Sequence, residues 1–152
     1  MIIMALIKVS DLYYAVHKTI REDEVLRELM GFDENTDMVE MATRIQKRMK
    51  PQNLAKENLP LITFYKLPGN RGVRNHLEYS TAFDFDVYTN DDVELALDIT
   101  DRISDLFDDE FLKCYSGTSF KGEYITSSED NTDLENTYKY FSQILFNLGI
   151  EG

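Results

Sequence analysis

The chain has 152 residues, the length of one domain that can bury a core of its own without a metal or disulfides. Sixteen Lys and Arg against twenty-eight Asp and Glu give a net charge of −12, which argues against a protein whose main partner is duplex DNA or an anionic membrane. The single cysteine, Cys114, excludes an intrachain disulfide, and the start MIIMALIKVS lacks the basic region and cleavage site of a signal peptide. We therefore expect a protein that stays in a cytoplasm or leaves it without such a signal.

Three helices are predicted in an N-terminal helical segment, residues 1–50. Apolar residues at three- and four-residue spacing predict the first helix over residues 10–20, with Ser10 or Asp11 as its N-cap. The same spacing predicts a second helix over residues 24–30 that stops at Gly31, and the two helices could be one broken helix.

The third predicted helix carries Met38, Met41 and Met49 on one stripe and ends near Lys50, because Pro51 cannot continue it. Methionines at this spacing could line a groove for a partner, but they more often fill a core. We expect them in the core.

A hairpin is predicted after residue 60. Residues 61–65 form a short apolar run, and residues 77–88 alternate strictly, so Phe83 and Phe85 share a core face while Asp84 and Asp86 share a solvent face. The connecting loop, residues 67–76, is unusually long, and loops of this length in compact domains are often functional.

A fourth helix, residues 92–107, is predicted from apolar spacing and from a capping box formed by Asp91 and Glu94. Two further strands are expected over residues 120–126 and 137–148, separated by a polar, acidic segment. This order predicts one α+β domain spanning residues 1–152. Its sheet-and-helix core, residues 60–148, should hold a mostly antiparallel four-stranded sheet with helices packed on one face.

One core cluster should form where the fourth helix crosses the sheet. Its expected members are Phe83, Phe85, Ile99, Ile103, Tyr140 and Ile144.

Little in the sequence points to catalysis. Asp84 and Asp86 could share a divalent cation, but the Glu and Lys that a nuclease needs on the next strand are poorly matched by Lys121 and Glu123. His17 is not accompanied by a serine or cysteine in a nucleophile setting. We expect no catalytic, metal or cofactor site.

The charges form two blocks of opposite sign. Residues 41–76 hold eight basic residues and one acidic residue, whereas residues 78–110 hold twelve acidic residues and one basic residue. These blocks could pair within the fold, or they could form the two unlike faces of a head-to-tail interface. The candidate interface residues are Lys66, Arg71, Arg74, Asp105, Asp108, Asp109 and Glu110.

Three stretches carry a resemblance to a known family: RIQKRMKPQNLAKENLPLITFYKLPG, EYSTAFDFDVYTNDDVELALDITDRISDLFDD and NTYKYFSQILFNL. Across residues 38–148 the chain resembles the tail terminator, or tail completion, proteins of long-tailed bacteriophages. Leu59-Pro60, Asp86-Val87-Tyr88 and Leu106-Phe107 hold the places of that family's Leu-Pro before a strand, Asp-x-Tyr at a strand end and Leu-Phe at a helix end.

The resemblance implies a non-enzymatic virion protein that is assembled in the bacterial cytoplasm. It would form a hexameric ring on the head-proximal end of the tail tube, stop polymerisation of the major tail protein and present a surface to the head-completion protein. DNA would pass through the ring without direct binding.

Three alternatives remain open from the sequence. The first is a neck or head-closure protein of the same kind of virion. The second is a metal-dependent nucleic-acid hydrolase that uses Asp84 and Asp86. The third is an acidic binding or immunity protein that mimics the charge of nucleic acid.

Overall fold

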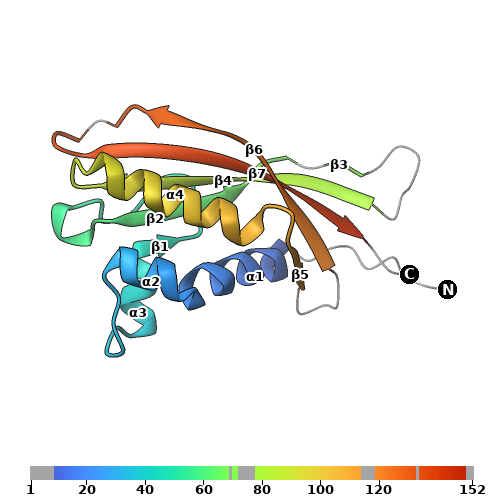
Figure 1. The fold of residues 1–152 in the computed structure, drawn as a ribbon, viewed down its shortest axis with the longest axis horizontal. Helices are drawn as coiled ribbons and strands as arrows, with labels where there is room; N and C mark the ends of the chain where they lie inside the picture. The colour runs from blue at the N-terminus through green and yellow to red at the C-terminus, as the bar shows by residue number, and fades with distance from the viewer. Residues whose placement is uncertain (1–8, 69, 72–77, 114–118, 133, 150–152) are drawn as a thin grey trace.

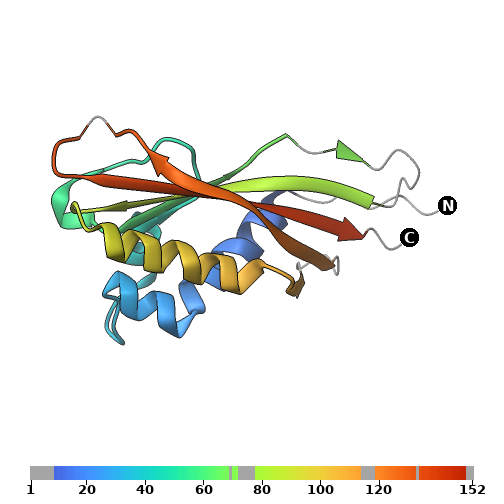
Figure 2. The same cartoon turned by 45° about the horizontal axis from the view of Figure 1, so that its top comes forward.

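The computed structural model describes residues 9–68, 70–71, 78–113, 119–132 and 134–149 (Figure 1). Figure 2 shows the helices together on one face of a long twisted sheet, as an α+β fold requires. In chain order the elements are α1 (Val9–Glu22), α2 (Glu24–Met30), α3 (Met38–Arg44), β1 (Ile45–Gln46), the 3-10 turn η1 (Lys56–Asn58), β2 (Leu61–Lys66), β3 (Asn70–Arg71), β4 (Glu78–Thr89), α4 (Val93–Phe107), β5 (Phe111–Lys113), β6 (Ser119–Asp130) and β7 (Tyr138–Gly149).

The sheet is larger than the sequence predicted. Among the described residues it has seven strands in the order β1-β2-β4-β7-β6-β5, with β3 paired to β4. β1 runs parallel to β2 and the other pairs are antiparallel, so the sheet is mixed. The four long strands, β2, β4, β6 and β7, are the four that were predicted, and the expected hairpin of β2 and β4 is present. The short strands β1, β3 and β5 were missed.

The helix boundaries follow their capping residues. α2 has the predicted limits, because the Asp23 carboxylate accepts the Leu26 amide at its start and Gly31 closes it at φ 78°. In the described part of the chain α1 spans Val9–Glu22, so the expected caps Ser10 and Asp11 lie inside the helix. α4 begins one residue later than expected.

The N-cap of α4 is Asp92, whose carboxylate accepts the Leu95 amide, and not Asp91. Asp91 instead has a positive φ of 53° in the turn before the helix, so the predicted capping box with Glu94 is wrong.

The prediction of a long third helix is also wrong. α3 ends at Arg44, and Ile45 and Gln46 turn into β1, where Ile45 pairs with Ile62 and is buried. Of the three methionines expected in the core, only Met41 is buried, whereas Met38 is 56% exposed and Met49 is 63% exposed. The stripe therefore leaves most of its apolar surface outside the core.

The predicted core is confirmed. Phe83 and Phe85 from β4, Ile99 and Ile103 from α4 and Ile144 from β7 belong to one buried cluster. Tyr140, the sixth residue of the prediction, is partly buried and packs against that cluster.

β6 is longer than predicted, since residues 127–130 continue the strand and pair with β7 instead of forming a polar loop. Where β6 passes the end of α4, the Gly122 carbonyl accepts the Asp109 amide at 2.8 Å. A Cβ atom at Gly122 would collide with the backbone carbonyl of Phe107, so this approach requires glycine.

Removing a core side chain should strongly destabilise the fold. Phe85→Ala or Ile103→Ala deletes a fully buried side chain and should lower the free energy of unfolding by about 2 to 5 kcal/mol. Thermal and urea denaturation measure this loss, and Val93→Ala, at a position that is 42% exposed on α4, serves as the control. Unchanged midpoints for both core variants would contradict the assigned core.

Gly122→Ala should destabilise the protein by about 1 to 3 kcal/mol, because the added methyl group forces the end of α4 away from β6. Ser128→Ala, at an exposed position of the same strand, is the control. Equal urea midpoints for the two variants would show that the contact tolerates a side chain.

Candidate interface surfaces

The carboxylates of Asp84 and Asp86 are buried, although the sequence placed them on a solvent face. Asp84 is 8% exposed and Asp86 is 3% exposed. The Tyr65 hydroxyl donates to Asp84 Oδ2 at 2.8 Å, and Lys139 Nζ lies 3.7 Å from Asp86 and 2.8 Å from Asp130. Side chains from β2 and β7, the strands on either side of β4, therefore cover the pair, and the prediction of a wet face is wrong.

The same geometry bears on the hydrolase alternative. β7 lies between β4 and β6, so Lys121 and Glu123 are two strands away from the Asp pair. Lys121 instead pairs with Asp109 at 2.8 Å. Within the described parts of the chain, no group of three or more His, Cys, Asp and Glu residues is arranged to hold a metal. The burial of the Asp pair and its contact with Lys139 favour a structural role.

Burial and the neighbouring Asp84 carboxylate raise the pKa of Asp86 to about 7, and the opposing attraction of Lys139 is smaller. The protonated form of Asp86 is therefore favoured in the folded protein.

The described candidate interface residues lie toward one end of the sheet. Lys66 ends β2, and its backbone amide donates to the Tyr13 hydroxyl at 2.7 Å. The backbone of Arg71 lies in β3, and Arg74 falls outside the described residues. Figure 1 shows β3 and the C-terminal end of α4 at the same end of the sheet.

The acidic candidates differ in what they contact within the chain. Asp109 is paired with Lys121, and Asp108 Oδ1 accepts the Tyr124 amide at 2.8 Å. Asp105 and Glu110 are exposed. Two of the four acidic candidates therefore have a local structural role in addition to any contact with a partner.

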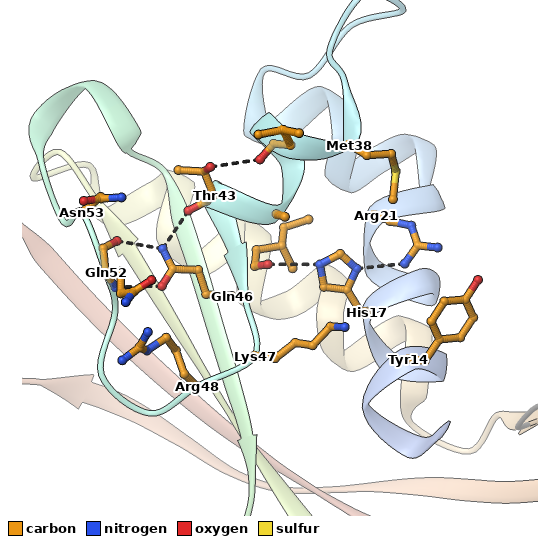
Figure 3. A pocket seen from close by; sticks show the side chains of 13 residues that line it. Tyr14, His17, Arg21, Met38, Thr43, Gln46, Lys47, Arg48, Gln52 and Asn53 are labelled. Atoms are coloured by element: carbon orange, nitrogen blue, oxygen red, sulfur yellow. Dashed lines mark hydrogen bonds between the residues drawn. The ribbon is translucent and has the colours of Figure 1, made fainter. Parts of the chain in front are cut away.

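A groove of about 690 Å³ opens beside β1, between α1 and α3 (Figure 3). From the sequence, a partner groove lined by the methionine stripe was only the alternative to a place in the core, and Met38 is the methionine of that stripe that lines this groove. Its lining residues are Tyr14, His17, Arg21, Met38, Val39, Ala42, Thr43, Ile45, Gln46, Lys47, Arg48, Gln52 and Asn53. The exposed methionine and valine of α3 were the only signal in the sequence that could have indicated it.

His17 and Arg21 form a rigid inner wall of this groove. Arg21 donates to His17 Nδ1 at 2.9 Å, so the ring proton lies on Nε2, which donates to the Ile45 carbonyl at 3.1 Å. Burial lowers the pKa of His17 to about 4, and the charges of Arg21 and Lys47 act in the same direction. His17 is therefore neutral at pH 7 and holds α1 against β1.

Gln46 fixes the other wall. Its side-chain amide donates to the carbonyls of Thr43 and Gln52, both at 2.8 Å, and its Oε1 accepts the Gln52 amide at 2.8 Å. These bonds hold the segment after β1 against the end of α3. The groove is therefore built by hydrogen bonds on both sides.

The groove combines positive charge with apolar surface. Arg21, Lys47 and Arg48 line it, and its lining includes no carboxylate. Val39, which is 76% exposed, and Met38 supply apolar surface on the α3 side. Such a surface suits a partner that presents both acidic and apolar side chains.

Asp86→Asn should change how stability depends on pH. Because the folded state keeps its proton up to about pH 7 and the unfolded chain releases it near the ordinary Asp value, this contribution to stability is present at acid pH and is lost as pH rises toward 7. The variant should therefore gain more stability relative to the natural protein at pH 8 than at pH 5 in urea denaturation. Asp101→Asn, at an exposed site on α4, is the control, and an identical pH profile for Asp86→Asn and the natural protein would contradict the raised pKa.

No helix among the described residues is long and apolar enough to cross a membrane. No family model matches the sequence, and the comparison with curated proteins gives no match. A chain in the solved structure "Virion of native gene transfer agent (GTA) particle" has a similar fold, with a TM-score of 0.64 at 16% identity, and the similarity covers 93% of this chain and 95% of that chain. At this level of identity, the comparison shows a shared fold over nearly the whole of both chains.

Proposed function

We propose that the chain is a structural protein of a phage-like virion, and specifically its tail terminator. The observation that supports this most strongly is the fold shared with a chain of a gene transfer agent virion over 93% of this chain and 95% of the other. The sequence resemblance to tail terminators points to the same class.

The motifs behind the resemblance lie at ends of secondary-structure elements. Leu59-Pro60 directly precedes β2, Asp86-Val87-Tyr88 lies near the end of β4 and Leu106-Phe107 ends α4. These places match those of the tail terminator pattern. Together they support the finer assignment over a generic virion protein.

In this role the protein forms a hexameric ring at the head-proximal end of the tail tube. Its partners are the major tail protein on one side and a head-completion protein on the other. The ring ends polymerisation of the tube and lets DNA pass. The function is structural and requires neither catalysis nor a cofactor, and the protein resides in the virion.

The candidate interface residues have a defined place in this proposal. Lys66, Arg71 and Arg74 meet an acidic surface, which is either the rim of the tail tube or the acidic end of α4 in a neighbouring copy. That acidic end comprises Asp105, Asp108, Asp109 and Glu110. Exposed ion pairs contribute about 0–1 kcal/mol each, so several must act together.

Loss of the protein should leave heads and tails unjoined. We expect deletion of its gene in particle-producing cells to give overlong tubes or free tails in electron micrographs, with filled heads lacking tails. Complementation with the natural gene is the control. Normal joined particles after deletion would contradict a role in tail completion.

Mass spectrometry of separated components distinguishes the two structural alternatives. A tail terminator should be recovered with isolated tails, whereas a neck or head-closure protein should be recovered with isolated heads. Recovery with heads alone would favour the neck alternative. Absence from both fractions and from whole particles would overturn a virion role.

Reversing the basic loop should impair assembly without unfolding the protein. Arg71→Glu combined with Arg74→Glu should give overlong or unjoined tails, because several attractive contacts become repulsive. The defect should become smaller as added salt screens this repulsion. Lys18→Glu, an exposed change on α1, is the matched control. Normal tails attached to full heads would remove this loop from the interface.

A further inference from the structure

The two edges of the sheet differ in chemistry. β1 lies at one edge beside the basic, apolar groove, whereas β6 lies toward the opposite edge. β5 pairs with β6 only from Ser119 to Lys121, so within the described residues 123–130 no strand pairs with the outer side of β6. Figure 1 shows β6 and the α3–β1 region on opposite sides of the molecule.

The open part of β6 is both acidic and apolar. Glu123, Glu129 and Asp130 are exposed, and so are Tyr124 at 44% and Ile125 at 48%. The register with β7 shifts between Tyr124 and Thr126, which leaves Ile125 without a partner across the ladder. A bulge of this kind redirects a side chain and discourages continuous strand pairing.

We propose that residues 123–130 of one copy dock into the groove beside β1 of a second copy. The apolar side chains Tyr124 and Ile125 would contact Met38 and Val39, and the neighbouring carboxylates would face Lys47 and Arg48. The charges are complementary, because the groove lining holds three cations and no carboxylate, while residues 123–130 hold three carboxylates and no cation. Asp130 is already paired with Lys139, so Glu123 and Glu129 carry the attraction.

The backbone of β1 indicates how this contact is made. The Ile45 carbonyl already accepts the His17 ring, and the Gln46 side chain is bonded to Thr43 and Gln52. These bonds leave β1 poorly suited to extend the sheet with an added strand. Docking therefore proceeds through side chains in the groove, and its electrostatic part should weaken as salt shortens the screening length.

Two unlike surfaces on opposite edges produce a head-to-tail contact. Such a contact builds a ring when the rotation between copies closes and a filament when it does not. The contact by itself explains only how two neighbouring copies bind each other. That such contacts close into a ring rests on the proposed function. The contact identifies the partner of the groove as a second copy of this chain.

Cysteine cross-linking between two different variants tests the contact. In a Cys114→Ser background, Val39→Cys protein is mixed with Ile125→Cys protein under mild oxidation. We expect a disulfide-linked dimer from the mixture and at least about tenfold less dimer from either variant alone, since a head-to-tail contact brings unlike surfaces together. Pairing Ile125→Cys with Lys18→Cys, on an exposed site of α1 outside the groove, is the matched control.

Charge reversal provides a second readout on the same mixture. Lys47→Glu with Arg48→Glu in the Val39→Cys protein should lower the dimer yield by about tenfold, and Glu123→Lys with Glu129→Lys in the Ile125→Cys protein should restore it. Circular dichroism melts of each variant verify that it is folded. The proposed contact would be overturned if Ile125→Cys gave as much dimer with Lys18→Cys as with Val39→Cys. It would also be overturned if the charge reversals neither lowered nor restored the dimer yield.

The outcome is separable from that of the proposed function. Loss of the cross-link while the protein is still found in isolated tails would overturn this contact and leave the tail terminator assignment in place. A specific, charge-dependent cross-link in a protein absent from particles would support the contact and overturn the virion role.

Discussion

Five phenylalanine rings fill the space between the sheet and the helices α1 and α4. Phe64, Phe83, Phe85, Phe107 and Phe146 are fully buried, with centroid separations of 5.4 to 6.3 Å between contacting rings. Aromatic contacts at these distances add to the stabilisation from burial. Because this cluster commits one face of the sheet to the helices, contacts with other proteins must use the outer surfaces of the helices, the opposite face of the sheet, its edges or its ends.

The opposite face shows how polar residues can cover a sheet without a second layer of helices. Asp84 and Asp86 are buried among Tyr65, Lys139 and Tyr88, and the Lys139 ammonium also lies 5.5 Å from the Tyr88 ring centre. Lys139 is shared between Asp86 and Asp130, and its attraction offsets only part of the cost of burying the Asp86 carboxyl group. The polar face is therefore part of the folded architecture, which leaves the edges of the sheet as the more accessible surfaces.

Sequence patterns located the elements whose signals are local. Gly31 marked the end of α2, and strict alternation in β4 placed Phe83 and Phe85 in the core. The patterns failed where distant residues decide the outcome. Ile45 leaves the helix because it pairs with Ile62, and residues 127–130 extend β6 because β7 offers them a neighbouring strand.

The candidate surfaces also divide into features with a local sequence signal and features that depend on distant residues. The unequal distribution of charge was visible in the sequence, but the positions of its members were not, since Asp108 and Asp109 turned out to anchor β6. The burial of Asp84 and Asp86 depends on Tyr65 and Lys139 from other strands. The groove depends on an early end of α3, and no periodicity could indicate that end.

The shortness of α3 also determines which part of the fold unfolds locally at the lowest free energy. β4 and β7 are paired over twelve residues each, whereas α3 spans seven residues and buries only Met41. Short helices with little buried surface open at a lower free energy than long central strands, so amides in α3 should exchange with solvent well before those in β4. The Met38–Val39 part of α3 is thus the adaptable side of the groove, while the hydrogen bonds of His17 and Gln46 and the sheet beneath them stay fixed. A docking segment can therefore be accommodated by local rearrangement without loosening the core.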